Sequence, residues 1–248
     1  MYAPHRVAAL VDACLLPACH GDRLPGWIAE GLAGDMPGVV LYGQAPAGLR
    51  DAYPDALIGR IPSGGTASGP VDGEANLHLG VRPLRGVGAT RAYVEGVQAH
   101  GVAVALGPFD GEPPLLPFAE GVAAGVRAVT VDTAAALGGA CVPELLRGQL
   151  GYDGVAVSGP LDASAVVERW GVPGAAVLAW IAGLDLLRLG PGCGPGVHRA
   201  VHTAAARAVA DGDLPAARLA EAATRVARLR RWAGDPGRIR RPAQFVQP

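Results

Sequence analysis

Short apolar runs alternate along the chain with longer segments whose apolar residues recur every three or four positions. Short runs bounded by Gly, Pro or polar residues are typical of strands buried on both faces, and the longer period is that of helices packed on one side. Strict alternation of the two predicts βα units around a parallel sheet. The predicted strands are residues 14–17, 38–42, 56–61, 102–106, 128–131, 154–158 and 185–189.

The predicted helices occupy most of the intervening chain. Several begin with a proline, which suits the first helical turn, and Gly101, Gly125 and Gly183 stand where a helix would end. The helices are residues 24–33, 90–100, 117–124, 143–149, 172–182, 195–211 and 215–232.

These elements predict an α/β fold, a TIM-like (β/α) barrel that is incomplete and has about seven strands. The chain has 248 residues, which is the usual size of such a barrel, and half of them are hydrophobic, enough for a sizeable core. We assign residues 1–233 to this degenerate barrel and residues 234–248 to an Arg- and Pro-rich C-terminal tail, which we expect to fray.

Composition excludes several classes of function. A formal net charge of -1 gives no basic surface for nucleic acid, and no apolar run is long enough to cross a membrane. The start of the chain lacks the charged-then-apolar order of a secretory signal, and four cysteines do not suggest a disulfide framework, so we expect a reduced, cytoplasmic protein. All 21 basic residues are arginines, as in proteins from bacteria with high G and C content. Enzymes that need a lysine amine are excluded, and we expect no cofactor.

The stretch Gly151-Tyr-Asp-Gly-Val-Ala-Val-Ser-Gly-Pro-Leu-Asp162 carries a family resemblance. It resembles the strand and turn Gly-Phe-Asp-Gly-Val-Val-Val-Thr-Asp-Ala-Leu-Asp of glycoside hydrolase family 3, β-N-acetylhexosaminidase type. The first Asp after Val-Thr is the family's nucleophile, and Gly159 stands at that position. Segments that begin at Leu24, Asn76, Arg91 and Val172 resemble further helices and strands of the family's N-terminal domain, in the family's order.

Two segments depart from the family pattern. Between Gln44 and Ala56 the chain is too short for the strand and helix that the family has there, so we expect a gap in the barrel. After Leu106, which stands at the family's sugar-binding lysine, the chain reads Gly107-Pro-Phe-Asp-Gly-Glu-Pro-Pro instead of the long loop that carries the acid/base histidine. Cleavage with retention needs a carboxylate nucleophile about 5 Å from a proton donor, and both are missing.

The resemblance therefore implies a pseudoglycosidase that has lost hydrolase activity and binds a ligand or a protein. The alternatives are a re-purposed lyase, isomerase or transferase of specialised biosynthesis, and a β-N-acetylhexosaminidase that is still active. We expect the ligand to be a sugar or a phosphorylated small molecule. A protein partner or a second copy of the chain could cover a sheet edge exposed at the gap.

Five residues are candidates for remaining chemistry. Arg82 stands at the family's sugar-contacting arginine, and a surface salt bridge is its alternative role. Asp132 and Thr133 end a predicted strand, where catalytic residues collect in barrels, yet capping of the next helix explains them equally well. We assign Asp162 to a cap or turn, and Ser158 is a hydrogen-bond donor to a ligand rather than a nucleophile, because no base lies nearby in the sequence.

The segment Leu189-Gly-Pro-Gly-Cys-Gly-Pro-Gly-Val-His198 follows the last predicted strand and opens a helix. Loops at this place in barrels often bind phosphate through backbone amides, so Gly190, Gly192 and Gly194 are candidate anion contacts, with a plain connection as the alternative. His198 and His202 would share one helical face, but no third ligand stands near them in the sequence. We therefore predict no metal site.

Overall fold

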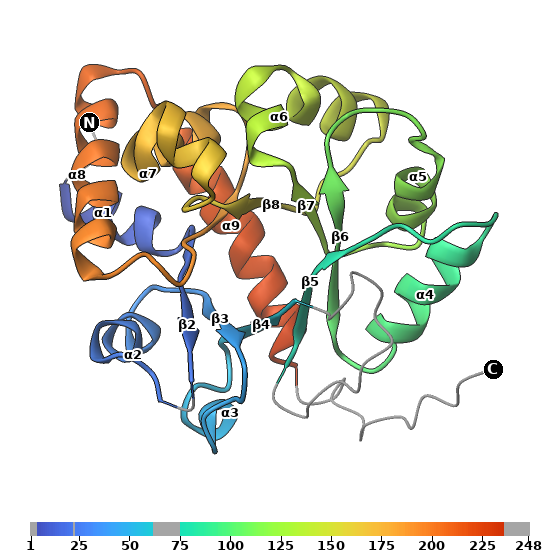
Figure 1. Ribbon diagram of the computed structural model, residues 1–248, viewed down its shortest axis with the longest axis horizontal. Helices are drawn as coiled ribbons and strands as arrows, with labels where there is room; N and C mark the ends of the chain where they lie inside the picture. Colours follow the sequence, from blue (N-terminus) through green and yellow to red (C-terminus); the bar gives the residue numbers. More distant parts are fainter. Residues whose placement is uncertain (1–3, 22, 62–74, 236–248) are drawn as a thin grey trace.

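The computed structural model describes residues 4–21, 23–61 and 75–235, and within them it contains one parallel sheet of nine strands. The order around the sheet is β1-β9-β8-β7-β6-β5-β4-β3-β2. Only Pro17 separates β1 (Leu15–Leu16), which pairs with β9 (Leu186–Arg188), from β2 (Ala18–His20), which pairs with β3 (Gly38–Tyr42). One continuous segment thus pairs on both sides, so the sheet curves round into a barrel (Figure 1).

The prediction of an incomplete α/β barrel is confirmed, although the sheet has more strands than seven. The additional strand is β5, in which His78 and Gly80 interrupt the apolar run that would have marked it in the sequence. The first predicted strand is longer than expected and split at Pro17. The remaining strands are β4 (Leu57–Arg60), β5 (Leu77–Val81), β6 (Ala103–Phe109), β7 (Ala128–Val131) and β8 (Val155–Pro160).

Helices surround the strands (Figure 1), and none of the described ones is long and apolar enough to cross a membrane. They are α1 (Pro4–Asp12), α2 (Gly26–Ala33), α3 (Leu49–Ala52), α4 (Ala89–Gln98), α5 (Leu116–Ala123), α6 (Thr133–Gly138), the π-helix η2 (Cys141–Gln149), α7 (Ser164–Ile181), α8 (Pro195–Asp211) and α9 (Ala216–Ala233).

Among the described residues, the helical layer is reduced beside β3 and β4. Helix α3 has only four residues, and residues 61, 75 and 76, the described part of the β4–β5 connection, form no helix. The expected gap in the sheet between Gln44 and Ala56 is wrong, because β3 and β4 pair directly through Gly38–Leu57, Val39–Ile58 and Val40–Gly59. The protein partner or second copy of the chain that we predicted near this segment stays a prediction. Most of the C-terminal tail lies outside the described residues.

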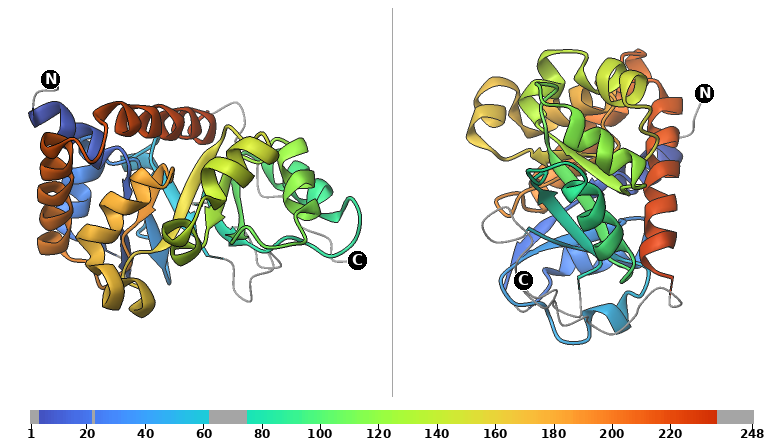
Figure 2. Two further views of the ribbon diagram at one scale, coloured as in Figure 1. Left: turned by 90° about the horizontal axis from the view of Figure 1, so that it is seen from above. Right: turned by 90° about the vertical axis from the view of Figure 1, so that its right-hand side faces the viewer.

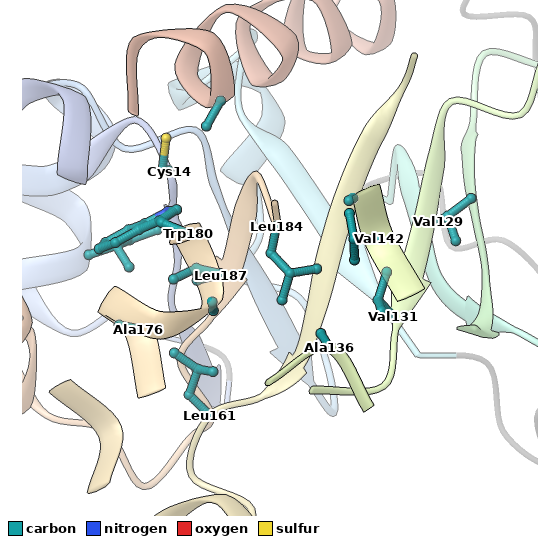
Figure 3. Packing of buried hydrophobic residues seen from close by; sticks show 14 of the residues in the cluster. Cys14, Val129, Val131, Ala136, Val142, Leu161, Ala176, Trp180, Leu184 and Leu187 are labelled. Carbon is teal, nitrogen blue, oxygen red and sulfur yellow. The ribbon is translucent and has the colours of Figure 1, made fainter. Parts of the chain in front are cut away.

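The core has two layers that follow the alternation of side chains along each strand. In β9, Leu186 points into the barrel, where it joins Leu16 and Leu79, whereas Leu187 points outward to the helices. Outside the sheet, Leu187 and Trp180 belong to one large apolar cluster (Figure 3). Successive residues of a strand point to opposite faces, so the last residue of β9, Arg188, points back into the barrel.

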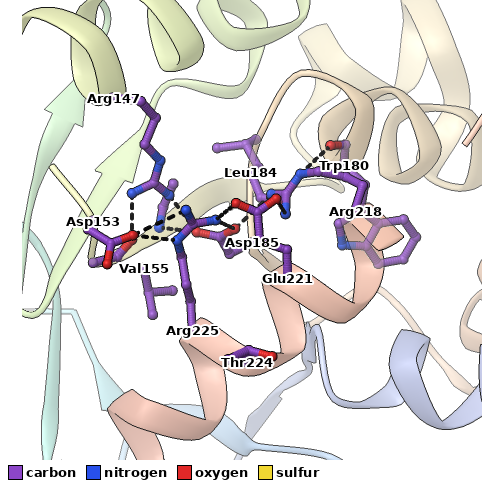
Figure 4. Close-up of polar contacts among 12 residues, drawn as sticks. Arg147, Asp153, Val155, Trp180, Leu184, Asp185, Arg218, Glu221, Thr224 and Arg225 are labelled. Atoms are coloured by element: carbon purple, nitrogen blue, oxygen red, sulfur yellow. Dashed lines mark hydrogen bonds and ion pairs between the residues drawn. The ribbon is translucent and has the colours of Figure 1, made fainter. Parts of the chain in front are cut away.

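Helix α9 covers the amino-terminal ends of the strands (Figure 2). There the fully buried carboxylate of Asp185, directly before β9, accepts bonds from Arg147 and Arg218 at 2.7 Å each and lies 3.5 Å from Arg225 (Figure 4). The backbone N–H of Ala156 donates to the same carboxylate at 3.0 Å. Every oxygen of this buried charge is paired, which a charge removed from water requires.

Candidate functional site

The carboxyl ends of the strands meet at the opposite end of the barrel, where active sites of this architecture lie. Gly159 is near the end of β8, and a Cβ built on it would lie 3.2 Å from Thr133 Oγ1 and 3.9 Å from Thr133 N. Thr133 is buried, and its Oγ1 has no hydrogen-bond partner within the described part of the chain. The structure thus brings together Gly159 and Thr133, two residues that the sequence analysis singled out.

Each of the two candidate aspartates accepts a hydrogen bond from a backbone N–H. Asp132 is the N-cap of α6 and accepts a hydrogen bond from Ala135 N at 2.9 Å. Asp162 accepts a hydrogen bond from Gly192 N at 3.2 Å and lies directly over Gly190, where any Cβ would collide with its carboxylate. These contacts agree with the cap role predicted for Asp132 and the turn role predicted for Asp162. Position 190 has to be a glycine, because the Asp162 carboxylate occupies the space that any side chain there would need.

Two other predicted residues lie away from the barrel interior. Ser158 is fully buried, its hydroxyl donates to Gly159 O at 2.6 Å, and it accepts a bond from Arg188 N at 2.9 Å. Its hydrogen-bonding capacity is therefore used within the barrel wall. Arg82 follows β5 directly, is exposed to solvent, and makes no ion pair among residues 4–21, 23–61 and 75–235.

The Gly-rich segment after β9 forms a compact connection into α8. Cys193 N donates to Gly190 O at 2.9 Å, and Gly194 is the N-cap of α8, accepting bonds from Val197 N and His198 N. With the bond from Gly192 N to Asp162, part of its backbone is already committed. All four cysteines of the chain, Cys193 included, are buried and unbridged.

Arg188 is the residue that the sequence interpretation missed. It is only 6% exposed, and it makes no ion pair within the described residues. Its Nε has no hydrogen-bond partner there, and its Nη2 donates to the Tyr42 hydroxyl at a long 3.4 Å. The ring of His20 lies beside Tyr42, with 5.0 Å between ring centroids. The signal in the sequence was a single arginine inside the apolar run Leu186-Leu-Arg-Leu189.

Burial lowers the pKa of the Arg188 guanidinium, while the neighbouring Tyr42 hydroxyl and the charge of Asp162 oppose this shift. An arginine nevertheless stays protonated in proteins. The carboxyl end of the barrel therefore holds a desolvated positive charge that makes no ion pair within the described structure, although the charge of Asp162 acts on it from farther away.

The connection that carries the acid/base histidine in the resembling family is short here. Residues 110–115 link β6 to α5, and the sequence has no histidine between His100 and His198. A groove of about 540 Å³ lies over this link and the loop after β5, with Asp110, Glu112 and Glu120 among the residues that line it. Arg85 lines the groove as well, so its lining carries charges of both signs.

His198 and His202 lie on one face of α8, as predicted, and both rings are partly buried against Asp12 at the end of α1. Each Nε2 lies 2.9 Å from Asp12 Oδ1, so Asp12 supplies the third potential ligand that the sequence around the two histidines does not show. Partial burial raises the pKa of Asp12, but the hydrogen bonds and charges of the two histidines outweigh it and lower that pKa to about 2. The contact joins residues 186 positions apart, so sequence spacing could not reveal it.

The comparisons with known proteins agree with the barrel. No protein-family model matches the chain, and no curated protein sequence does. A solved glycoside hydrolase family 3 β-N-acetylglucosaminidase from Paenibacillus sp. FPU-7 superposes with a TM-score of 0.72 at 20% identity, over 96% of this chain and 64% of that one. A fungal multi-domain enzyme of the same family gives 0.75 at 16%, over 95% of this chain and 40% of that one.

The β-N-acetylhexosaminidase from Beutenbergia cavernae gives a TM-score of 0.71 at 20% identity, and here the match covers 90% of this chain and 98% of that one. The chain thus spans less than two thirds of the first two proteins but nearly all of the third. At these identities the likeness concerns the fold, and the fold is that of the N-terminal barrel domain of glycoside hydrolase family 3.

Proposed function

We propose that this protein is a non-hydrolysing barrel that binds a small anionic ligand, a phosphorylated or carboxylated sugar, at the carboxyl ends of its strands. The observation that carries the proposal is Arg188, a guanidinium buried inside the barrel that makes no ion pair within the described residues and whose Nε has no hydrogen-bond partner there. A buried charge is costly unless it is paired, and an arginine prefers phosphate or carboxylate as its partner. A bound anion would complete the hydrogen bonds that Arg188 lacks.

Loss of hydrolysis is supported by the same end of the barrel. Gly159 offers no carboxylate to attack a sugar, the connection at residues 110–115 has no histidine, and Asp132 and Asp162 are committed to backbone hydrogen bonds. Nucleophile and proton donor would both have to come from elsewhere.

The binding test is a titration of the full chain with inorganic phosphate, glucose 6-phosphate, N-acetylglucosamine 6-phosphate and glucuronate, followed by melting temperature and calorimetry. A ligand that binds only the folded state at 100 times its Kd stabilises it by about 2.7 kcal/mol. Arg188→Met should abolish the rise in melting temperature. Arg207→Met, a change of the same kind on an exposed arginine of α8, should leave it intact. Equal responses in the two variants would overturn the proposal.

A parallel assay addresses hydrolysis. Chromogenic N-acetylglucosaminide and glucoside substrates should give no turnover with the unmodified chain. Turnover that disappears in Asp132→Ala or Asp162→Ala would instead show an active glycosidase. Arg82→Met, tested in the same titrations, separates the buried arginine from the exposed one at the family's sugar-contacting position.

A further inference from the structure

We infer that Asp12, His198 and His202 form a binding site for one zinc-type divalent cation, between α1 and α8. The two histidine Nε2 atoms each lie 2.9 Å from Asp12 Oδ1, and one potential ligand atom from each residue lies within 4.8 Å of the other two. This is the one cluster of at least three such residues found in the described part of the chain.

The donor set matches the chemistry of zinc. Zinc sites use imidazole nitrogens and carboxylate oxygens, and two histidines one helical turn apart present both rings on one face of α8. Two histidines and one carboxylate leave at least one coordination position open, as in sites that keep a water. The side chains are 17%, 22% and 28% exposed, so solvent reaches the cluster and can supply both the cation and that water.

The ligand side chains are held in place before any cation binds. The ring of Trp27, on α2, packs against His198 with 5.4 Å between centroids, and the rings of His198 and His202 lie 4.6 Å apart. Asp12 ends α1, whose Val7 and Val11 are buried in the core. Side chains that are already ordered lose little entropy when they bind, which favours affinity.

A hydrogen-bonded bridge without metal is the competing explanation. In that bridge each histidine carries its proton on Nε2, and this N–H donates a hydrogen bond to Asp12 Oδ1. A divalent cation would coordinate the same three atoms, and each neutral histidine would then carry its proton on Nδ1. A purely structural bridge has no reason to bind Zn²⁺ saturably.

The test uses the full chain without an affinity tag, treated with chelator and titrated with Zn²⁺ by calorimetry. We expect one equivalent of Zn²⁺ to bind. In His198→Ala, His202→Ala and Asp12→Asn the affinity should fall by at least about 10- to 100-fold, a range that loss of outer-shell partners alone can cause. His100→Ala, a change of the same kind at the end of α4, should bind as the unmodified chain does.

Co²⁺ gives a second measurement. A tetrahedral Co²⁺ complex absorbs visible light, and the band should appear with the unmodified chain and be absent from the three ligand variants. If an alanine variant does not fold, His202→Gln replaces it, because glutamine can still donate a hydrogen bond toward Asp12. Zn²⁺ affinity that is the same in the ligand variants and in His100→Ala, or no saturable binding at all, would overturn the inference.

Discussion

The two ends of β9 differ in whether their buried charge is paired. Directly before the strand, Asp185 is fully buried and shared by Arg147, Arg218 and Arg225. At its last residue, Arg188 is almost as buried and has no carboxylate partner within the described structure. In barrels the amino-terminal end serves stability and the carboxyl end serves function. The contrast puts the buried charge that lacks an ion pair at the end of the barrel where we propose that a ligand binds.

The largest expected effect is at Asp185. Asp185→Ala should lower the free energy of unfolding by about 3–5 kcal/mol, because it leaves three arginines without their buried counter-charge. Urea denaturation measures the change. Asp153→Ala, at the same end but with a side chain 68% exposed, is the matched control and should cost less than about 1 kcal/mol. Similar losses of unfolding free energy in the two variants would mean that the buried network around Asp185 stabilises the fold no more than the exposed ion pairs do.

Arg188→Met should change the free energy of unfolding in the opposite direction. Removal of a buried, unpaired charge in favour of an apolar side chain should raise the free energy of unfolding of the ligand-free protein by about 1–3 kcal/mol. The same denaturation experiment measures it. A loss of more than about 2 kcal/mol would show that Arg188 is structural, and the contrast between the two ends would disappear.

Asp162→Ala addresses the loop at the carboxyl end. The carboxylate accepts a hydrogen bond from Gly192 N, so its loss should cost about 1 kcal/mol. Amide hydrogen exchange should become faster over residues 190–194 and stay unchanged in β9. Exchange that is unaffected there would mean that the Gly-rich segment holds its shape without Asp162.

The smallest effect is a pH dependence at Asp153. The hydrogen bond from Arg228 lowers the pKa of this carboxyl; burial opposes the shift, and the hydrogen bond from Arg225 and the charges of both arginines add to it. A lowered pKa in the folded state gives stability that is present above the unfolded pKa and lost as the pH falls below about 4. In Asp153→Asn that acid-side loss should shrink by less than about 1 kcal/mol, because solvent screens the exposed pair. An unchanged acid-side loss in this variant would mean that the pair contributes nothing.

Much of the barrel could be read from the sequence because buried strands leave apolar runs. The run at Ala128–Val131 became β7 with the predicted bounds, whereas His78 and Gly80 hid β5. The candidate site was less accessible. Arg188 faces the interior because of strand alternation, and the contact of Asp12 with His198 needs two helices to be placed in space. Such features depend on tertiary contacts, which local sequence patterns do not encode.

The split first strand has a consequence for how the chain folds. Leu15 pairs with Leu187, so the contact that closes the barrel joins residues 172 positions apart. Contacts of such long range carry a high entropic cost before they form, and they slow folding. During synthesis on the ribosome, β1 cannot pair with β9 until β9 has emerged. Until then the amino-terminal half presents an open sheet edge, the state in which this protein most needs protection from aggregation.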